Sequence, residues 1–450
     1  MHLQTLAHAT MLVSAERDSA PVLATDPWLF GSCYWRSWWL SRPPEPEQIE
    51  LVARSRYIYL SHEHPDHLHV PSLRRVASGS TVLVPDFLEM KMDRYLRDEM
   101  GLTVQRLPPN QWVSLGDGVR VLSLPYPSND SVLLVDTPEA LLINLNDVKP
   151  VLSFLEAIGQ MTRRLDKPRV VLRSYSLAGP ANSFFVEGQR RPSKSVRGYV
   201  LTAGHHAAAL GGDYFVPFAS QAVFRRRDSE WANEFSADYA LLQEYWKADT
   251  RLLPPYVSLD LGTFEYTAPK PSDYGAPSLT FRQKELVSES HDRDADETLN
   301  GDDVLRLQAI LNEERLALLC LFPGGIAFVA GDLRLTYDPV RGKVREGKHQ
   351  AAVTVDVPTG PFRDALQHGH FTDLFIGLFC QIHLEHEEKG ATFEKLYRFL
   401  FLRDYGYGGV WKRLHWMFWA WRRVNPKVLP PPTLADETQD LRTSPSGELQ

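Results

Sequence analysis

The segment YLSHEHPDHLHV, Tyr59–Val70, places four histidines and an aspartate within eight residues, and this cluster decides the fold. It continues a run of β-forming residues, Tyr57–Leu60, which predicts a strand that ends just before the histidines. Because alternate side chains of an extended chain share a face, His62 and His64 are expected to project together from the end of that strand. Two imidazoles on one face would form half of a metal site.

A second pair of ligand-type side chains follows in the same segment. Pro65 ends the strand, so the turn after it is expected to bring Asp66 and His67 to a neighbouring position. Two adjacent half-sites of this kind suit a dinuclear metal centre, and we prefer this interpretation to a polar loop that merely caps a strand end. His69 falls outside the spacing and is expected to be an ordinary loop residue.

Length and composition restrict the function classes. A chain of 450 residues with 43% hydrophobic residues is expected to form two domains. Its net charge of -7 provides no positive field for a nucleic acid. Three cysteines, far apart, argue against a disulfide scaffold and against a cysteine-based zinc site. We see no secretory signal and no apolar stretch long enough to span a membrane, so a cytoplasmic location is expected.

Short β-like runs and helical stretches alternate through the first half of the chain, which predicts an α/β domain. The predicted strands are Thr10–Val13, Val22–Thr25, Tyr57–Leu60, Ser80–Val84, Arg120–Leu124, Ser131–Val135 and Leu141–Asn144, and the predicted helices are Pro85–Met100 and Val151–Leu165.

The second half divides differently. Residues 251–300 are rich in Pro, Ser, Asp and Glu, which predicts a linker or exposed loops. Residues 301–425 are expected to form a smaller α+β domain that faintly resembles sterol-carrier-type folds, and 430–450 a disordered tail. The elements expected in the smaller domain are helices over Asp302–Asn312 and Gly360–Gln367 and strands over Ala317–Phe322, Ile326–Val329 and Ala352–Val357.

The order His-x-His-x-Asp-His after an apolar strand resembles the signature of the metallo-β-lactamase superfamily. HATMLV (His8–Val13), followed by DPWL (Asp26–Leu29), is similar to the branch that contains CMP-sialic acid hydroxylases and ascorbate-phosphate lactonases. The resemblance covers about residues 1–240. The fold class that it implies is α/β, an αββα metallo-β-lactamase sandwich over 1–250 with the second, smaller α+β domain at the C-terminus.

The resemblance also implies a later histidine, a bridging aspartate and a final histidine as ligands. Asp147, which follows an apolar strand in LLINLNDV, is predicted to bridge, with Asn144 and Asn146 orienting it. At the first histidine position the chain reads YPSNDSVLLV, where Asp130 is the nearest side chain that could bind a metal. Asp130 is therefore a candidate ligand, with a strand-capping turn residue as the alternative.

The final histidine has no counterpart, because Phe218 follows Pro217 where relatives often have a histidine. The sequence leaves this ligand open, and an unfilled coordination position is one alternative. The other candidates are His205, His206, Asp213, Asp228 and Glu230.

A donor set that exchanges imidazole for carboxylate favours iron or manganese over zinc. SYSLAGPANSFF, Ser174–Phe185, resembles the sialic acid hydroxylases, but the chain lacks the Cys and His pairs of a Rieske cluster. We predict a dinuclear non-haem iron monooxygenase that hydroxylates a small, largely apolar substrate, as diiron oxygenases of this fold do in natural-product biosynthesis. The expected cofactors are two iron ions, with zinc or manganese as alternatives, O2 as co-substrate, and electrons from a separate reductase or ferredoxin.

Two other classes stay open. A dinuclear metallohydrolase of the same fold would cleave a lactone, thioester or phosphodiester through a metal-activated hydroxide. A degenerate binding protein that has lost catalysis is the second alternative, and the missing histidines favour it.

Two aromatic stretches are too rich in Trp, Tyr and Phe for ordinary loops. Trp28–Leu40 is expected to form core or interface, with the wall of an apolar substrate pocket as the alternative. Val410–Val424 has aromatic residues at helical spacing with Arg and Lys between them. We expect this helix to pack on the body or on the second subunit of a homodimer rather than on a membrane.

Overall fold

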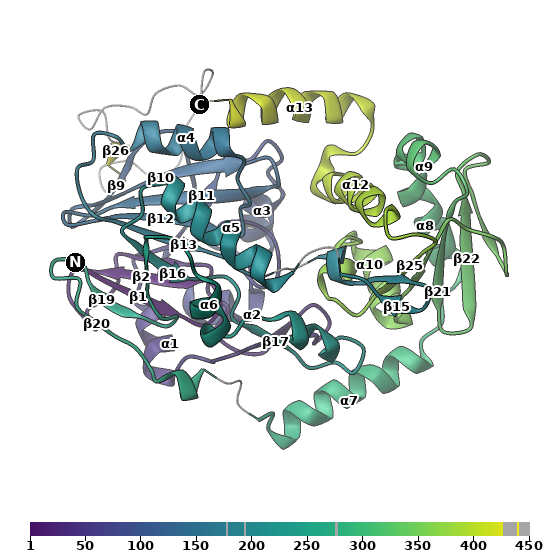
Figure 1. The fold of residues 1–450 in the computed structure, drawn as a ribbon, viewed down its shortest axis with the longest axis horizontal. Coiled ribbons are helices and arrows are strands. Elements are labelled where there is room, and N and C mark those ends of the chain that lie inside the picture. The colour runs from purple at the N-terminus through teal and green to yellow at the C-terminus, as the bar shows by residue number, and fades with distance from the viewer. Residues whose placement is uncertain (177–178, 193–194, 275–277, 426–438, 441–450) are drawn as a thin grey trace.

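The chain folds into two bodies that lie side by side (Figure 1). The computed structural model describes residues 1–176, 179–192, 195–274, 278–425 and 439–440. The first body comprises residues 1–267 apart from 184–190, and the second comprises 301–402 together with 184–190.

Two eight-stranded sheets form the first body. The first sheet has the order β20 (Tyr266–Thr267), β19 (Ser258–Asp260), β1 (His2–Leu6), β2 (Thr10–Ser14), β3 (Leu23–Thr25), β6 (Tyr57–Tyr59), β7 (Thr81–Pro85) and β8 (Val104–Leu107). The second sheet has the order β18 (Arg251–Leu252), β16 (Tyr214–Pro217), β13 (Arg169–Arg173), β12 (Leu141–Asn146), β11 (Asp130–Asp136), β10 (Val119–Tyr126), β9 (Val113–Gly116) and β26 (Gln439–Asp440).

The strands in the middle of these sheets are buried on both faces, which explains their continuous apolar sequences. All six residues of β12 are buried. In β13, Val170 and Leu172 pack in the core between the two sheets, whereas Val171 packs under the outer helices. One side of the sandwich is covered by α1 (Pro46–Ala53), α2 (Val70–Val76) and α3 (Lys91–Arg94), the other by α4 (Leu152–Met161), α5 (Val196–Ala209) and α6 (Tyr239–Tyr245). The first body is therefore the αββα sandwich that the sequence predicts.

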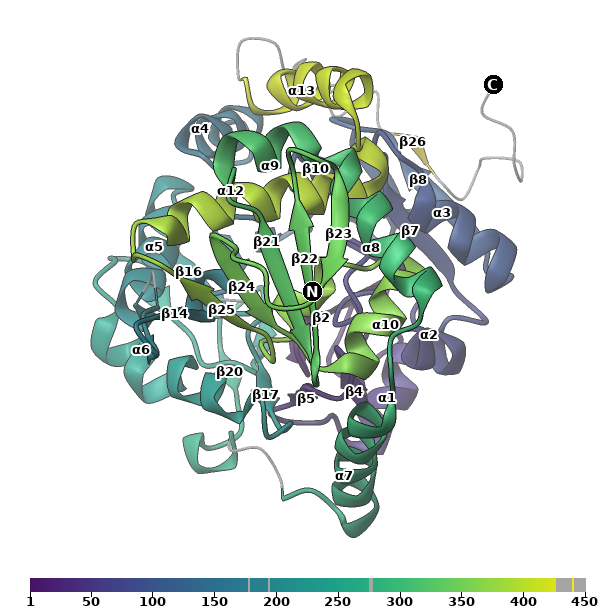
Figure 2. The same ribbon diagram turned by 90° about the vertical axis from the view of Figure 1, so that its right-hand side faces the viewer.

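The second body is a seven-stranded sheet with helices packed on it, as Figure 2 shows. Its order is β15 (Gln189–Arg190), β14 (Phe184–Val186), β25 (Gln381–Leu384), β24 (Val353–Asp356), β21 (Ile326–Ala330), β22 (Leu333–Asp338) and β23 (Lys343–Glu346). The helices are α8 (Gly301–Glu313), α9 (Arg315–Leu321), α10 (Thr359–His368), α11 (Asp373–Ile376) and α12 (Lys389–Leu402).

Three expectations for the second half were wrong. The strand predicted over Ala317–Phe322 is α9, because this leucine-rich stretch has a high helix propensity. Residues 251–300 are not only a linker: Arg251–Thr267 supplies three short strands to the sandwich, and Phe281–Asp296 forms α7. The predicted boundary between the domains also misses β14, which pairs with β25 although it precedes α5 of the first body.

Two segments complete the fold. A small sheet of β17 (Ala222–Phe224), β5 (Trp38–Leu40) and β4 (Ser32–Cys33) lies against the first body. After α12, an irregular helical turn, Arg403–Tyr407, leads to α13 (Val410–Val424), which lies along the top of Figure 1. In the predicted tail 430–450, only Gln439–Asp440 lies within the described residues, as a strand.

The aromatic stretch Trp28–Leu40 is largely core and interface. Trp28, Trp38 and Trp39 are buried, and Trp28 and Trp38 belong to the core outside the first sheet. The Trp35 ring lies 5.8 Å from that of Phe379 in the second body. The stretch therefore helps to join the two bodies.

Candidate metal centre

Polar side chains gather at one edge of the sandwich, where strands of both sheets end. The loop Ser61–His69 follows β6, Asp147 follows β12, and Asp26 follows β3. Asp130 begins β11, which runs antiparallel to β12 and so starts at the same edge. His8 lies in the turn between β1 and β2. The topology brings together five separate parts of the sequence.

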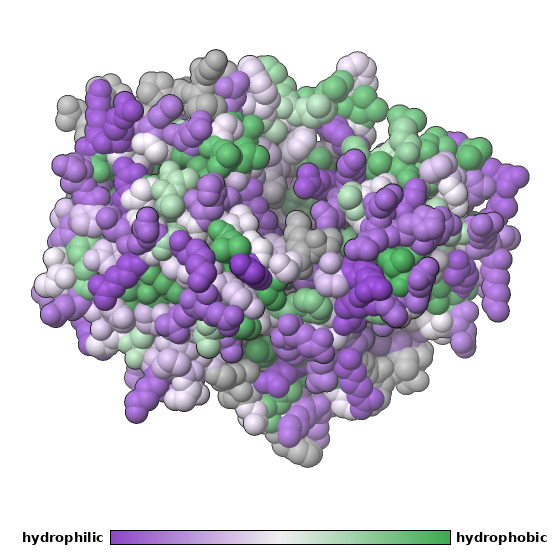
Figure 3. Space-filling model, viewed as in Figure 1, coloured by the Kyte–Doolittle hydropathy of each residue, from purple (hydrophilic) through white to green (hydrophobic). Residues whose placement is uncertain are grey.

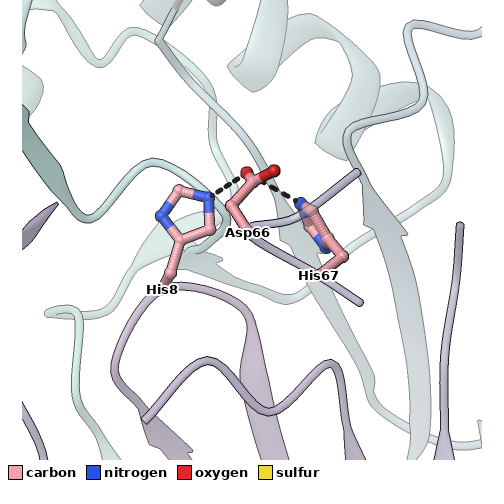
Figure 4. A group of neighbouring side chains, drawn as sticks. All are labelled: His8, Asp66 and His67. Carbon is pink, nitrogen blue, oxygen red and sulfur yellow. Dashed lines mark ion pairs between the residues drawn. The ribbon is translucent and has the colours of Figure 1, made fainter. Parts of the chain in front are cut away.

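The first group is centred on Asp66 (Figure 4). Asp66 Oδ2 lies 3.2 Å from His8 Nε2 and 3.3 Å from His67 Nε2. His67 Nε2 also lies 3.6 Å from Asp147 Oδ2. His8, Asp66 and His67 each offer one atom within 4.8 Å of the others, an arrangement that could hold a metal ion.

The second group lies beside the first and shares His67 with it. His62 Nδ1 lies 3.0 Å from Asp130 Oδ1, and His62 Nε2 lies 2.8 Å from His64 Nδ1. The rings of His62 and His67 are 4.1 Å apart. His62, His67 and Asp147 form a second set of ligand atoms within 4.8 Å of one another.

Several atoms of these groups are buried without a hydrogen bond. They are His8 Nε2, His64 Nε2, His67 Nε2 and Asp130 Oδ1. The short nitrogen–oxygen contacts to His8, His67 and Asp130 are close enough for hydrogen bonds but are not aligned as such. An unsatisfied buried polar atom costs about 1–3 kcal/mol, whereas cations between these atoms would satisfy them together. The residues present therefore fit metal ions.

A His-x-His-x-Asp-His loop and a later aspartate thus meet at one edge of an αββα sandwich. The first body has the metallo-β-lactamase fold. No family model matches the chain.

Among curated proteins, the cytidine monophosphate-N-acetylneuraminic acid hydroxylase of Asterias rubens is 25% identical over 133 residues, which cover 28% of this chain and 20% of that protein. The hydroxylase of the same name from Sus scrofa is 44% identical over 52 residues, 12% of each chain. The matches therefore span a fifth or less of these relatives' length.

Among solved structures, an isothiocyanate hydrolase from Delia radicum gut bacteria matches with a TM-score of 0.41 and 14% identity, over 60% of this chain and 99% of that chain. A variant of the CmlA β-hydroxylase matches with a TM-score of 0.36 and 19% identity, over 48% of this chain and 45% of that chain.

Asp26 and Asn146 contact the histidine loop, Ser61–His69, on the side away from the candidate metal positions. Asp26 accepts hydrogen bonds from the Ser61 backbone N–H and from the Asn146 side chain, both 2.8 Å long. Asn146 Nδ2 and Asp26 Oδ2 lie 3.2 and 3.4 Å from His67 Nδ1. A carboxylate at Nδ1 favours the proton on that nitrogen. Burial alone would lower the pKa of His67, but Asp66, Asp147 and Asp26 outweigh it and hold this pKa well above its usual value, so a cation bound at Nε2 would displace a proton. Asp26 thus orients His67, and Asn146 in turn donates to Asp26, whereas Asn144 accepts a hydrogen bond from the Asn146 backbone.

Tyr34 holds Asp66 from the other side. Its hydroxyl donates a 2.7 Å hydrogen bond to Asp66 Oδ1. Tyr34, Trp35 and Arg36 have φ values of 49°, 52° and 66°, a left-handed turn that is strained for residues other than glycine. Trp35 Nε1 donates a hydrogen bond to Asp364 of the second body, so contacts to both bodies hold this turn in place.

Burial and neighbouring charges set the protonation of the cluster. Burial lowers the pKa of His64 to about 4, and burial with the nearby imidazoles holds the pKa of His62 well below its usual value. Both rings are thus neutral, as metal ligation requires. Burial alone would raise the pKa of Asp66, but His67 and His8 outweigh it and keep this carboxylate ionised. Burial and the neighbouring Asp147 raise the pKa of Asp130, so a cation between the two would relieve their repulsion.

The end of α12 and the turn that follows it cover the centre. The rings of Phe401 and Tyr405 lie 6.1 and 6.2 Å from that of His64. A cavity of about 30 Å³ adjoins His8 and Asp147. Its apolar wall includes Trp38, Phe224, Phe235 and Leu378. The centre therefore opens onto a small space of mixed polar and apolar lining, formed by the first body and closed by Leu378 of the second.

All six residues predicted as metal ligands lie in this cluster: His62, His64, Asp66, His67, Asp130 and Asp147. His69 lies outside it and caps the N-terminus of α2. Sequence reasoning missed His8, whose only signal was its place in the HATMLV segment. Phe218, where the final histidine was expected, is buried between the sheets, and the Ala219 N–H donates to the His8 carbonyl. His8 thus lies next to the segment in which the missing histidine was expected, and its imidazole is a further candidate ligand.

The later candidates lie elsewhere. Asp213 accepts a hydrogen bond from the Arg169 backbone, and Asp228 pairs with Arg226. His205 and His206 are on α5, and Glu230 is exposed on the surface. His206 is 7% exposed and lies near Arg173. Arg173 is buried at the end of β13 and, like His8, was not indicated by the sequence.

Proposed function

We propose that the chain is a dinuclear iron oxygenase that hydroxylates a small organic substrate. The observation that carries this proposal is the donor set, in which three carboxylates, Asp66, Asp130 and Asp147, face four imidazoles. A set with this share of oxygen donors suits iron or manganese better than zinc. The names of the sequence relatives, which are hydroxylases, support the same reaction class.

The ligands divide into two sets in this proposal. His62, His64 and Asp130 would hold one ion, and His8, Asp66 and His67 the other, with Asp147 between them. The ions would supply the activation of O2, with electrons from a separate reductase or ferredoxin. Tyr34, through Asp66, and Asp26, through His67, would fix the directions of two ligands.

The protein would position the substrate beside the ions and exclude water from the site. Trp38 of the first body and Leu378 of the second line the cavity beside His8 and Asp147. Such a wall would hold an apolar C–H group beside the ions and exclude water, which protects a reactive intermediate from side reactions. The apolar part of this lining supports a substrate that presents an apolar C–H group to the ions.

Anaerobic reconstitution with ferrous iron tests the proposal. We expect about two iron ions per chain, a coupled diferric Mössbauer spectrum after exposure to air, and O2 uptake with a reductant and candidate substrates. The control is Asp147→Asn, which removes the carboxylate between the two sets and is expected to abolish the coupled spectrum.

The same experiment separates the two alternatives. Four imidazoles can also serve zinc, and a dinuclear zinc centre would act as a hydrolase through a metal-activated hydroxide. Stoichiometric zinc after growth in mixed metals, together with turnover of lactone or thioester substrates, would replace the oxygenase by a hydrolase. A chain that retains neither metal would instead be a binding protein.

A further inference from the structure

Helix α13 presents a continuous apolar face to solvent. The six apolar residues of this face recur three or four positions apart, so they lie on one side of the helix. Their exposed fractions are 83% for Trp411, 59% for Phe418, 58% for Val410, 54% for Met417, 51% for Trp421 and 50% for Leu414. In Figure 3, apolar side chains gather at the upper edge of the molecule, where α13 lies. The expectation that this face packs on the body was wrong.

The opposite face of α13 anchors the helix to both bodies. Arg413 pairs with the buried Glu314 of the second body at 2.6 Å. The Ser153 hydroxyl of α4 donates a 3.2 Å hydrogen bond to the Val424 carbonyl. Ala420, on the same side, is buried. The helix is therefore fixed in place with its apolar face turned outward.

The charges of α13 have one sign. Residues 410–424 contain Lys412, Arg413, Arg422 and Arg423 and no aspartate or glutamate, although the whole chain has a net charge of -7. Lys412 and Arg422 are both exposed. Arg422 lies at the margin of the apolar face, whereas Lys412 projects from the flank of the helix beyond Trp411. An exposed apolar face with aromatic residues and flanking cations is typical of helices that lie in the surface of an anionic bilayer.

We propose that α13 docks this protein on the surface of an anionic lipid bilayer. Trp411, Met417 and Phe418 enter the boundary between headgroups and acyl chains. Arg422 at the margin of this face contacts the lipid phosphates, and Lys412 on the flank adds its charge within the screening length of the surface. The helix lies in the plane of the bilayer, since among the described residues no helix is long and apolar enough to cross it. This inference is independent of the reaction proposed for the metal centre.

A second copy of the chain could also cover the apolar face of α13. In a two-fold symmetric contact the apolar face of α13 would meet its own copy, which would bring cations of the two helices closer together. The helix has no acidic residue to compensate them, and like charges brought together at an interface disfavour association. Charge complementarity therefore favours the anionic lipid surface.

Co-sedimentation of the full chain with vesicles tests the proposal. We expect binding to phosphatidylcholine vesicles that contain about one-third phosphatidylserine, and much weaker binding to phosphatidylcholine alone, with salt reducing the difference. Each cation near such a surface contributes about fivefold to binding, so Lys412→Gln with Arg422→Gln should weaken it about 25-fold. Trp411→Ser with Phe418→Ser should abolish detectable binding.

The matched control is Leu305→Ser with Val340→Ser, which removes two side chains that are 62% and 64% exposed on the second body. This variant should bind like the wild type, and circular dichroism should be unchanged in all variants because the altered side chains are at the surface. Failure of the wild type to bind, or equal binding by the Trp411/Phe418 variant, would overturn the proposal. A dimer that this variant dissociates, without vesicle binding by the wild type, would assign the face to a second copy instead.

Discussion

His8 Nε2 lies 3.2 Å from Asp66 Oδ2, although one residue belongs to a hairpin turn of the first sheet and the other to the loop after β6. The His8 carbonyl accepts a hydrogen bond from the Ala219 N–H, so this hairpin turn lies beside the segment after β16, where a final histidine ligand was expected. His8 is therefore a candidate ligand in place of a histidine at position 218.

The first prediction concerns His8 itself. His8→Ala removes one ligand atom from the group around Asp66, so we expect the reconstituted protein to retain about one metal ion fewer per chain. The measurement is elemental analysis after removal of free metal. His205→Ala, at an exposed histidine of α5, serves as the control and should retain the wild-type amount. Equal metal content in both variants would contradict the role of His8.

Asp130 sets the metal preference in our proposal. Asp130→His replaces a carboxylate by an imidazole, and we expect the zinc-to-iron ratio of protein grown in mixed metals to rise, because softer nitrogen donors favour zinc. Asp130→Asn, which removes the charge without adding an imidazole, should lower the content of both metals. An unchanged ratio in the histidine variant would place Asp130 outside the ligand set.

Tyr34→Phe keeps the ring but deletes the hydrogen bond to Asp66 Oδ1. We expect metal affinity to fall by roughly 10–100-fold, the usual effect of losing a partner that orients a ligand. Tyr337→Phe removes a 2.8 Å hydrogen bond to Asn312 in the second body and should leave metal affinity unchanged. Competition with a chelator measures both, and equal affinities in the two variants would show that Tyr34 serves stability alone.

The buried His206 should make the fold sensitive to acid. Burial, with Arg173 and His205 nearby, lowers the pKa of His206 to about 3. Its pKa in the unfolded chain is about 6.5, so the unfolded chain binds the proton first as the pH falls. The stability from neutral His206 is complete above about pH 6.5 and is lost on the way down to pH 3. Between pH 6.5 and pH 5 the loss amounts to about 2 kcal/mol.

Urea unfolding at these two pH values measures the effect. His206→Gln cannot take up the proton, so its free energy of unfolding should fall about 2 kcal/mol less than that of the wild type over this interval. The same pH dependence in both proteins would mean that His206 is protonated at no extra cost in the folded state.

Five of the six predicted ligands share one property, and Asp130, which begins β11, is the exception. His62, His64, Asp66, His67 and Asp147 all follow apolar strands, and the residues after a strand can be placed at a sheet edge from the sequence alone. His8 could not be placed in this way, because its neighbours come from other loops that only the tertiary fold brings close.

The same distinction applies to the fold. The long apolar strands of the first body were predictable from their patterns, and so was the alternation of strands with helices. β18, β19 and β20 have two or three residues each, too few for any periodicity, and they lie in a region whose composition resembles a linker. Their pairing with β16 and β1 depends on tertiary contacts.

The pairing of β14 with β25 affects how the protein is made. A ribosome releases Phe184–Val186 about 200 residues before Gln381–Leu384, the strand that they pair with. The nascent chain must therefore keep an incomplete sheet edge free of other partners while the intervening helices are synthesised. The sheet of the second body is therefore complete only after residue 384 has been synthesised, and until then an unpaired strand edge is exposed to pairing with other chains.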